Sequence, residues 1–138
     1  MAAKLKKLLV IDDDPDIRKL IAAMARGRYE VVPAADGYAA LDLARAAPPD
    51  VALVDLVMPG LDGLETLRQL LRLLPGVPVT MLTGNTDISA AREALALGAH
   101  AFVTKPISCT AEEFWALVDP VARPDVEKPW RVVDPPKE

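Results

Sequence analysis

The chain has 138 residues, of which 51% are hydrophobic, 4% aromatic and 26% charged. This length and balance favour one globular domain over two and exclude a disordered or fibrous chain. The 16 basic and 20 acidic residues leave a net charge of −4, which gives no electrostatic reason to bind nucleic acid or an acidic membrane surface. We therefore expect no direct DNA binding.

Short apolar runs alternate with segments of helical spacing along the chain. In order, the sequence predicts strand 8–11, helix 16–25, strand 30–33, helix 36–47, strand 51–54, helix 64–74, strand 77–82, helix 88–97, strand 101–104 and helix 111–118. The apolar runs are rich in Val, Leu and Ile without polar alternation, which is typical of strands buried on both faces of a parallel sheet. This alternation predicts a doubly wound α/β fold.

Capping residues agree with these helix limits. Asp14 precedes Pro15 at the first turn of the first helix, as an N-cap should. Gly98 occupies the place of a C-terminal glycine cap. Thr110 and Glu113 have the spacing of a capping box at the start of the last helix.

The C-terminal end departs from a regular helical pattern. Pro120 ends the last helix early, and residues 124–138 contain four further prolines. We therefore divide the chain into a domain at 1–123 and a proline-rich tail at 124–138. Trp130 in this tail favours docking on the chain's own domain or on a neighbouring subunit.

No secretion or membrane signal is present in the sequence. The basic N-terminus is followed by an apolar run of only four residues, 8–11, which is too short for a signal peptide. No run approaches the roughly 20 apolar residues of a membrane span, and the single Cys109 cannot form an internal disulfide. These features predict a cytoplasmic protein with no membrane association.

Reactive side chains follow four of the five predicted strands: Asp12 and Asp13, Asp55, Thr83, and Lys105. The carboxyl ends of parallel strands meet at one edge of the sheet, so these groups should gather there. Clustered carboxylates need a cation or a lysine to offset their repulsion, and an all-oxygen set suits Mg²⁺. Carboxylate, magnesium, lysine and threonine together can support phosphoryl transfer to an aspartate.

The sequence resembles the receiver domain of two-component response regulators over about residues 5–118. The motifs that carry the resemblance are LLVIDDD at 8–14, VALVDLVMPGLDG at 51–63, VTMLTG at 79–84 and AFVTKP at 101–106. The resemblance implies a flavodoxin-like fold with a five-stranded parallel sheet flanked by helices, here with a short last helix.

The resemblance also implies the roles of the acidic residues. Asp55 would be the phosphorylated aspartate. Asp12 and Asp13 would hold Mg²⁺ together with Asp55 and the backbone carbonyl of Val57. Gly63 would adopt a backbone geometry that other residues resist.

Three residues would act on the phosphoryl group or respond to it. Lys105 would pair with the phosphoryl group or with Asp55, and Thr83 would bond a phosphoryl oxygen. Phe102 would be an aromatic switch that turns inward when Thr83 moves, although a lone aromatic in a strand is more often part of the core. The family's pattern also implies a cis peptide bond before Pro106.

The resulting prediction is a single-domain response regulator that is a phospho-accepting switch and not an enzyme. It would take its phosphoryl group from a sensor histidine kinase or a histidine phosphotransferase. Output would pass by contact to an unknown protein target through segments 87–97, 101–105 and 110–119, and homodimer formation stays open.

Two alternatives remain at this point. A phosphatase of the haloacid-dehalogenase type would explain the spacing of Asp12 and Asp14, but it leaves Asp55 unexplained and needs an acidic motif that residues 105–108 lack. A receiver-like interaction module without phosphorylation would leave the acceptor set without a purpose. His100 has no second ligand near it in sequence, so we interpret it as a surface or loop histidine.

Overall fold

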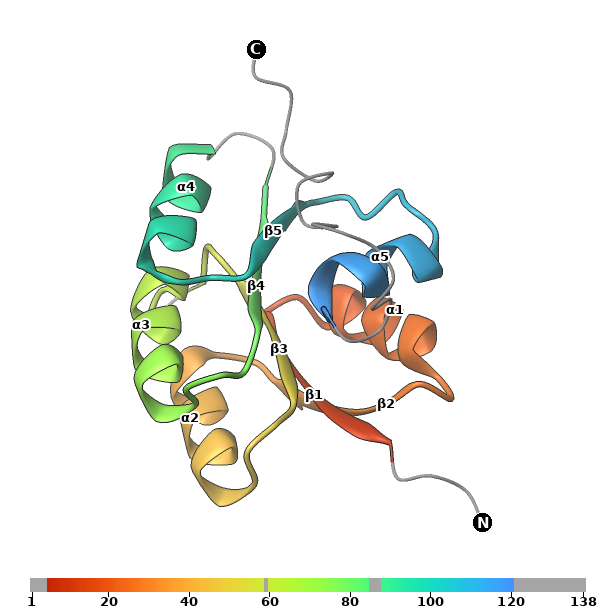
Figure 1. Ribbon diagram of the computed structural model, residues 1–138, viewed down its shortest axis with the longest axis horizontal. Coiled ribbons are helices and arrows are strands. Elements are labelled where there is room, and N and C mark those ends of the chain that lie inside the picture. Colours follow the sequence, from red (N-terminus) through yellow and green to blue (C-terminus); the bar gives the residue numbers. More distant parts are fainter. Residues whose placement is uncertain (1–4, 59, 85–87, 121–138) are drawn as a thin grey trace.

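Strands and helices alternate along the chain as the sequence predicts. The computed structural model describes residues 5–58, 60–84 and 88–120, so the predictions for Trp130 and the tail at 124–138 lie outside the described residues. The elements are β1 (Lys6–Ile11), α1 (Pro15–Ala25), β2 (Tyr29–Ala34), α2 (Gly37–Ala46), β3 (Val51–Asp55), α3 (Gly63–Leu73), β4 (Val79–Thr83), α4 (Ile88–Leu97), β5 (Ala101–Thr104) and α5 (Ala111–Val118) (Figure 1).

All five strands are parallel and form one sheet in the order β2-β1-β3-β4-β5. Helices α2, α3 and α4 cover one face of the sheet, and α1 and α5 cover the other (Figure 1). This arrangement confirms the doubly wound α/β fold. The strand order reverses between β1 and β3, and the ligands of such folds bind beside the carboxyl ends of strands at this kind of point.

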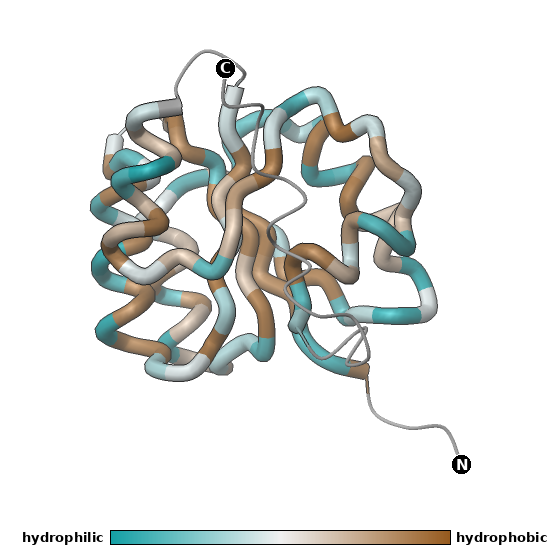
Figure 2. The backbone as a smooth tube through the Cα atoms, turned by 45° about the horizontal axis from the view of Figure 1, so that its top comes forward, coloured by the Kyte–Doolittle hydropathy of each residue, from teal (hydrophilic) through white to brown (hydrophobic). Residues whose placement is uncertain are grey.

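The central strands are buried as their unbroken apolar sequences predict. Every residue of β3 and β4 is buried, and so are the last four residues of β1. The hydrophobic strands run through the middle of the molecule between the two helical layers (Figure 2). Strand β2 lies at an edge and exposes Glu30 and Pro33, and an edge strand is where a proline disturbs pairing least.

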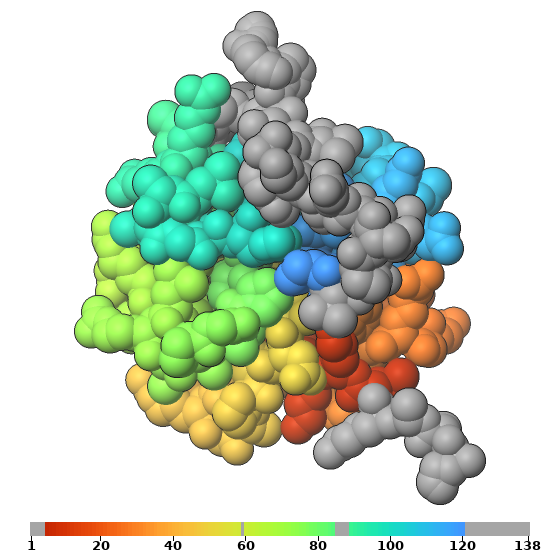
Figure 3. Space-filling view, in the orientation of Figure 1, coloured from red at the N-terminus to blue at the C-terminus, as the bar shows by residue number. Residues whose placement is uncertain are grey.

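Two apolar cores result, one on each face of the sheet. Within β1, Leu9 and Ile11 belong to the core under α2, α3 and α4, whereas Leu8 and Val10 belong to the core under α1 and α5. This alternation follows from the two-residue period of a strand. The three helices of the first layer are stacked along one side of the molecular surface (Figure 3).

The predicted caps are confirmed. The Asp14 side chain accepts a hydrogen bond from the Asp16 N–H at the start of α1. Thr110 and Glu113 form the predicted capping box of α5. Gly98 has a φ of +129°, and Ala99 after it donates its N–H to an α4 carbonyl, so Gly98 ends that helix.

Most element boundaries differ from the prediction by one or two residues. The largest differences are two residues, at the starts of β1 and β4: β1 begins at Lys6 and β4 at Val79. For β4 the reason is local, because Pro78 has no N–H to donate. The Pro78 carbonyl still accepts a hydrogen bond from Ala52, so the strand pairing starts immediately after it.

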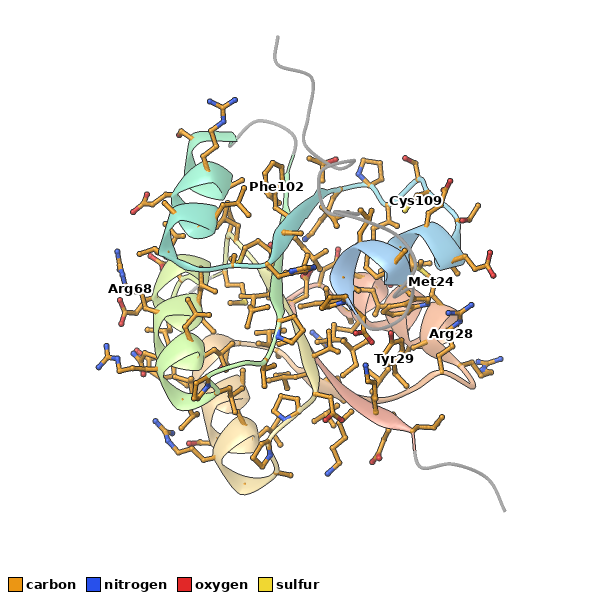
Figure 4. The ribbon with its side chains drawn as sticks, in the orientation of Figure 1. Met24, Arg28, Tyr29, Arg68, Phe102 and Cys109 are labelled. Carbon is orange, nitrogen blue, oxygen red and sulfur yellow. The ribbon has the colours of Figure 1, made fainter. Side chains whose placement is uncertain are left out.

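The short α5 ends in a polar cluster that no sequence motif indicates. Asp119 is 1% exposed, and its carboxylate accepts hydrogen bonds from Lys6 Nζ at 2.8 Å and from the Tyr29 hydroxyl at 2.7 Å. The Tyr29 ring lies 4.6 Å from the ring of Trp115, whose indole N–H donates to the Met24 carbonyl. Figure 4 shows Tyr29 and Met24 on the α1 and α5 side of the sheet.

His100 lies in the loop before β5, as predicted, but it is not a freely exposed surface residue. Its side chain is half-buried where the chain leads into β5, and its Nε2 atom is buried without a hydrogen-bond partner among the described residues. Burial lowers the pKa of His100, although a hydrogen bond to the Leu117 carbonyl and the charge of Asp119 act in the opposite direction. The local sequence did not reveal this burial because α5, which covers His100, lies later in the chain.

Candidate functional site

The carboxyl ends of the strands bring the predicted reactive groups together. Lys105 follows β5, and its Nζ atom lies 3.0 Å from Asp12 Oδ2 and 3.3 Å from Asp55 Oδ1. One lysine therefore pairs with two carboxylates that are 43 positions apart in sequence, since the parallel strands β1 and β3 are neighbours. The peptide bond between Lys105 and Pro106 is cis, as the resemblance implied.

The turn between β1 and α1 holds Asp12 through several contacts. Its N–H donates to the Ala34 carbonyl at 3.1 Å, and its Oδ1 accepts from the Asp14 N–H at 2.9 Å. Its carbonyl oxygen accepts from Arg18 Nη1 at 2.6 Å. Asp12 is fully buried, whereas Asp13 beside it is exposed. The contact of Arg18 could not be predicted from the sequence, because nothing in the linear pattern separates Arg18 from the adjacent Lys19.

Asp55 ends β3 beneath the loop that leads to α3. It is 5% exposed, and its Oδ1 accepts from the Val57 N–H at 3.3 Å. The Val57 side chain is 66% exposed. The role of the Val57 carbonyl as a metal ligand stays a prediction.

Gly63 is required here for space and not for the unusual backbone geometry that the resemblance implied. Its φ is not among the positive glycine angles of the described chain. A Cβ atom at this position would overlap the Asp55 carbonyl oxygen and would lie 2.6 Å from the Leu56 Cα. The start of α3 therefore packs directly on the backbone that carries Asp55.

The charges at this edge of the sheet perturb one another. Burial, followed by the negative charge of Asp12, raises the pKa of Asp55 to about 6, while Lys105 and the Val57 N–H act to lower it. Burial alone would lower the pKa of Lys105, but the hydrogen bonds and charges of Asp12 and Asp55 raise it above its usual value. At neutral pH the site therefore holds a charged lysine and a mostly ionised Asp55 of raised basicity.

The donor set fits Mg²⁺. Asp12, Asp13 and Asp55 each offer a carboxylate oxygen, and these atoms lie within 4.8 Å of one another. Asp12 Oδ2 is buried, accepts no well-directed hydrogen bond, and has only the Lys105 ion pair among the described residues to offset its charge. A small divalent cation with oxygen ligands would reduce the repulsion among these carboxylates.

Thr83 and Phe102 occupy the neighbouring strand ends. Thr83 is fully buried, its hydroxyl donates to the Gly84 carbonyl at 3.0 Å, and its own carbonyl accepts from the Lys105 N–H at 2.8 Å. Phe102 is 2% exposed and packs in the core on the α4 side of the sheet (Figure 4). A buried ring is compatible both with a core residue and with one state of a switch, so the switch role stays a prediction.

The single thiol of the chain is not activated as a nucleophile. Cys109 is free and partly buried, and burial raises the pKa of its thiol. It is therefore protonated at neutral pH and a weak nucleophile.

Within residues 5–58, 60–84 and 88–120, every helix is too short or too polar to cross a membrane.

Known proteins with similar sequences include response regulators, in agreement with the motifs described above. Residues 8–117 match the response regulator receiver domain family. The chain is 37% identical over 102 residues to the DNA-binding response regulator MtrA of Mycolicibacterium smegmatis, a match that covers 73% of this chain and 44% of MtrA. It is 38% identical over 104 residues to the probable transcriptional regulator ycf27 of Porphyridium aerugineum, covering 75% of this chain and 43% of that protein. The matched part is thus less than half the length of these relatives.

Solved structures show the same fold. The receiver domain of NtrX from Brucella abortus has a TM-score of 0.75 and 31% identity, with 88% of this chain and 98% of that domain covered. The chemotaxis protein CheY4 of Vibrio cholerae has a TM-score of 0.71 and 32% identity, with 76% and 90% covered.

Proposed function

Because the chain belongs to the response regulator receiver family of two-component systems, we propose that it is a phosphorylation switch whose acceptor is Asp55. One observation supports this assignment above all. Asp55 is a nearly buried carboxylate at the end of β3, 3.3 Å from the Lys105 ammonium and clustered with the carboxylates of Asp12 and Asp13. Family membership removes the haloacid-dehalogenase alternative, in which Asp55 had no role.

The proposed step is an in-line displacement at phosphorus. A carboxylate oxygen of Asp55 forms the new P–O bond as the bond from phosphorus to the donor's histidine nitrogen breaks, and the electron pair of that bond leaves with the imidazole. The raised pKa of Asp55, about 6, makes it a stronger nucleophile than an ordinary carboxylate while leaving it mostly ionised at neutral pH.

The surrounding side chains would offset the charge of the phosphoryl group. Lys105 already pairs with Asp55 and Asp12 and lies within reach of an oxygen on phosphorus. Thr83 would exchange its present bond to the Gly84 carbonyl for one to a phosphoryl oxygen. Mg²⁺, held by Asp12, Asp13, Asp55 and the Val57 carbonyl, would supply positive charge to the equatorial oxygens.

The partners and the output follow from the same proposal. The donor would be a sensor histidine kinase or a histidine phosphotransferase, and output would pass by protein contact through α4, β5 and α5 to a target that the sequence does not name. We propose that the chain changes only its own phosphorylation state, does not bind DNA directly and acts in the cytoplasm. DNA binding is stated in the name of MtrA, which is more than twice as long as the part that matches.

Phosphorylation by a small-molecule donor tests the proposal. Incubation with acetyl phosphate and magnesium should add one labile phosphoryl group, seen by intact-protein mass spectrometry. Asp55→Asn should abolish the label, because it removes the nucleophile and keeps the shape of the side chain. Asp42→Asn, at an exposed position on α2, is the matched control and should label like the wild type.

Each outcome separates the remaining alternatives. Labelling of the wild type that disappears only in Asp55→Asn supports the switch. A wild type that does not label with any donor would favour the unphosphorylated interaction module. Labelling of Asp55→Asn at the wild-type rate would show that Asp55 is not the acceptor.

A further inference from the structure

Arg18 makes an unusual contact for a helix residue, because its side chain returns to the strand end that carries the acidic pair. Its Nη1 atom donates to the Asp12 carbonyl oxygen at 2.6 Å, while its backbone N–H donates to the carbonyl of Asp14, the N-cap of α1, at 3.2 Å. Arg18 is half-buried, in contrast to its exposed neighbour Lys19. The contact is charge-assisted and short, as strong hydrogen bonds are.

The Asp12 carbonyl belongs to the rigid peptide unit that joins Asp12 to Asp13. Since that unit is planar, the direction of its carbonyl fixes the starting direction of the Asp13 backbone. The far side of Asp13 is also held, because the Asp14 N–H donates to Asp12 Oδ1 at 2.9 Å. Asp13 is therefore an exposed carboxylate between two anchored peptide units, and Arg18 supplies one of the anchors.

We propose that Arg18 is a positioning residue for the magnesium site: it fixes the Asp12–Asp13 peptide so that the Asp13 carboxylate lies close to those of Asp12 and Asp55. This inference rests on the proposed function, in which these three carboxylates hold Mg²⁺. In this proposal Arg18 acts only through its bond to the Asp12 carbonyl, since a guanidinium has no acceptor atom with which to bind a cation. Groups that orient the ligands of a metal commonly contribute about tenfold or more to its affinity.

The sign of the effect separates positioning from simple electrostatics. Arg18 places a positive charge near a cation site, so charge alone would make its removal strengthen Mg²⁺ binding. Positioning predicts the reverse, because the Asp12–Asp13 peptide gains freedom that Mg²⁺ binding must then remove. A weaker affinity after loss of the positive charge would have no simple Coulombic explanation.

The test is a titration with Mg²⁺ alone, followed by the amide shifts of residues 13, 14 and 57 in ¹H–¹⁵N spectra of the full chain. Arg18→Gln should raise the Mg²⁺ dissociation constant about tenfold. Lys19→Gln removes the same charge from the same helix without this contact and should change the constant about twofold or less. Arg18→Lys keeps the charge but not the guanidinium geometry, and it should also weaken binding.

The outcomes are distinct. An unchanged or lower dissociation constant in folded Arg18→Gln would overturn the positioning role, and if that variant does not fold, the same result in Arg18→Lys would do so. If Asp13→Asn binds Mg²⁺ as tightly as the wild type does, the proposed metal site itself is wrong. Weakening in both Arg18 variants, with Lys19→Gln near the wild type, supports the proposal.

Discussion

Burial disfavours the charged form of a side chain, so it raises the pKa of an acid and lowers the pKa of a base. The pKa of Asp55 rises and the pKa of His100 falls, and in both cases burial is the largest cause. Asp55 has Lys105 beside it to limit the shift. His100 has no such partner at Nε2 among the described residues, so an imidazolium there would bury an N–H without an acceptor.

His100 should make the stability of the folded chain depend on pH. Its pKa is lower in the folded state than its ordinary value of 6.5, so the unfolded chain binds the proton more tightly. The stabilisation from neutral His100 is fully present above pH 6.5 and is lost as the pH falls below that value. Urea unfolding, followed by tryptophan fluorescence on both sides of this pH, should show the wild type losing more stability on acidification than His100→Gln.

The comparison with His100→Gln is needed because Asp55 acts in the opposite direction. Its raised pKa gives the folded state more protons than the unfolded chain, so Asp55 on its own makes the fold relatively more stable on acidification below a pH of about 6. The two proteins share this contribution, and it cancels in their difference. Parallel stability profiles for the wild type and His100→Gln would contradict the prediction.

At the scale of elements, the close approach of α3 to β3 determines where Asp55 lies. Gly63 is the first residue of α3, and its N–H donates to the Leu56 carbonyl at 3.1 Å. Any side chain at position 63 would push the helix away from the backbone of Asp55 and Leu56. The packing of α3 on β3 therefore affects both the stability of the fold and the position of Asp55.

Gly63→Ala should therefore destabilise the fold by about 1–3 kcal/mol, the usual cost of overpacking a tight contact. It should also slow labelling of Asp55 by acetyl phosphate, because the displaced loop carries the acceptor. Gly84→Ala is the control, since a Cβ there meets no heavy atom within 4 Å. Thermal unfolding with equal midpoints for the two variants would show that the contact can relax without cost.

At the scale of the whole molecule, the Lys6, Tyr29 and Asp119 cluster joins the beginning of the described fold to its end. Lys6 and Asp119 are separated by 113 positions, yet the Asp119 carboxylate accepts from both Lys6 and Tyr29. The cluster lies at the amino end of β1 and β2, away from the strand ends that carry Asp12 and Asp55. It therefore contributes to stability without contacting the candidate site.

Asp119→Ala should destabilise the fold by about 1.5–3 kcal/mol, because hydrogen bonds to a buried charge are among the stronger ones. Acetyl phosphate labelling of the folded variant should be close to that of the wild type. Asp42→Ala removes an exposed ion pair with Arg45 and should change stability by about 1 kcal/mol or less. Equal losses in the two variants, measured by urea unfolding, would contradict the importance of burial at Asp119.

The sequence by itself determined the fold class, the ten elements and the residues gathered at the edge of the sheet. These follow from local patterns: unbroken apolar runs for buried strands, helical spacing and caps, and polar residues placed directly after strands. Asp12, Asp55 and Lys105 come together because parallel strands share one carboxyl edge. The family motifs assigned roles to these residues, and family membership is confirmed.

Only the tertiary structure decided what depends on contacts between distant segments. The burial of His100 and the link from Lys6 to Asp119 depend on segments far apart in the chain. The contact of Arg18 with the Asp12 carbonyl spans only six positions, but no helical or strand period predicts it. Gly63 was predicted to be special, but its reason is the space between α3 and β3 and not its backbone angle. Packing geometry sets these features, because the chemical type of a residue does not specify what the rest of the chain places against it.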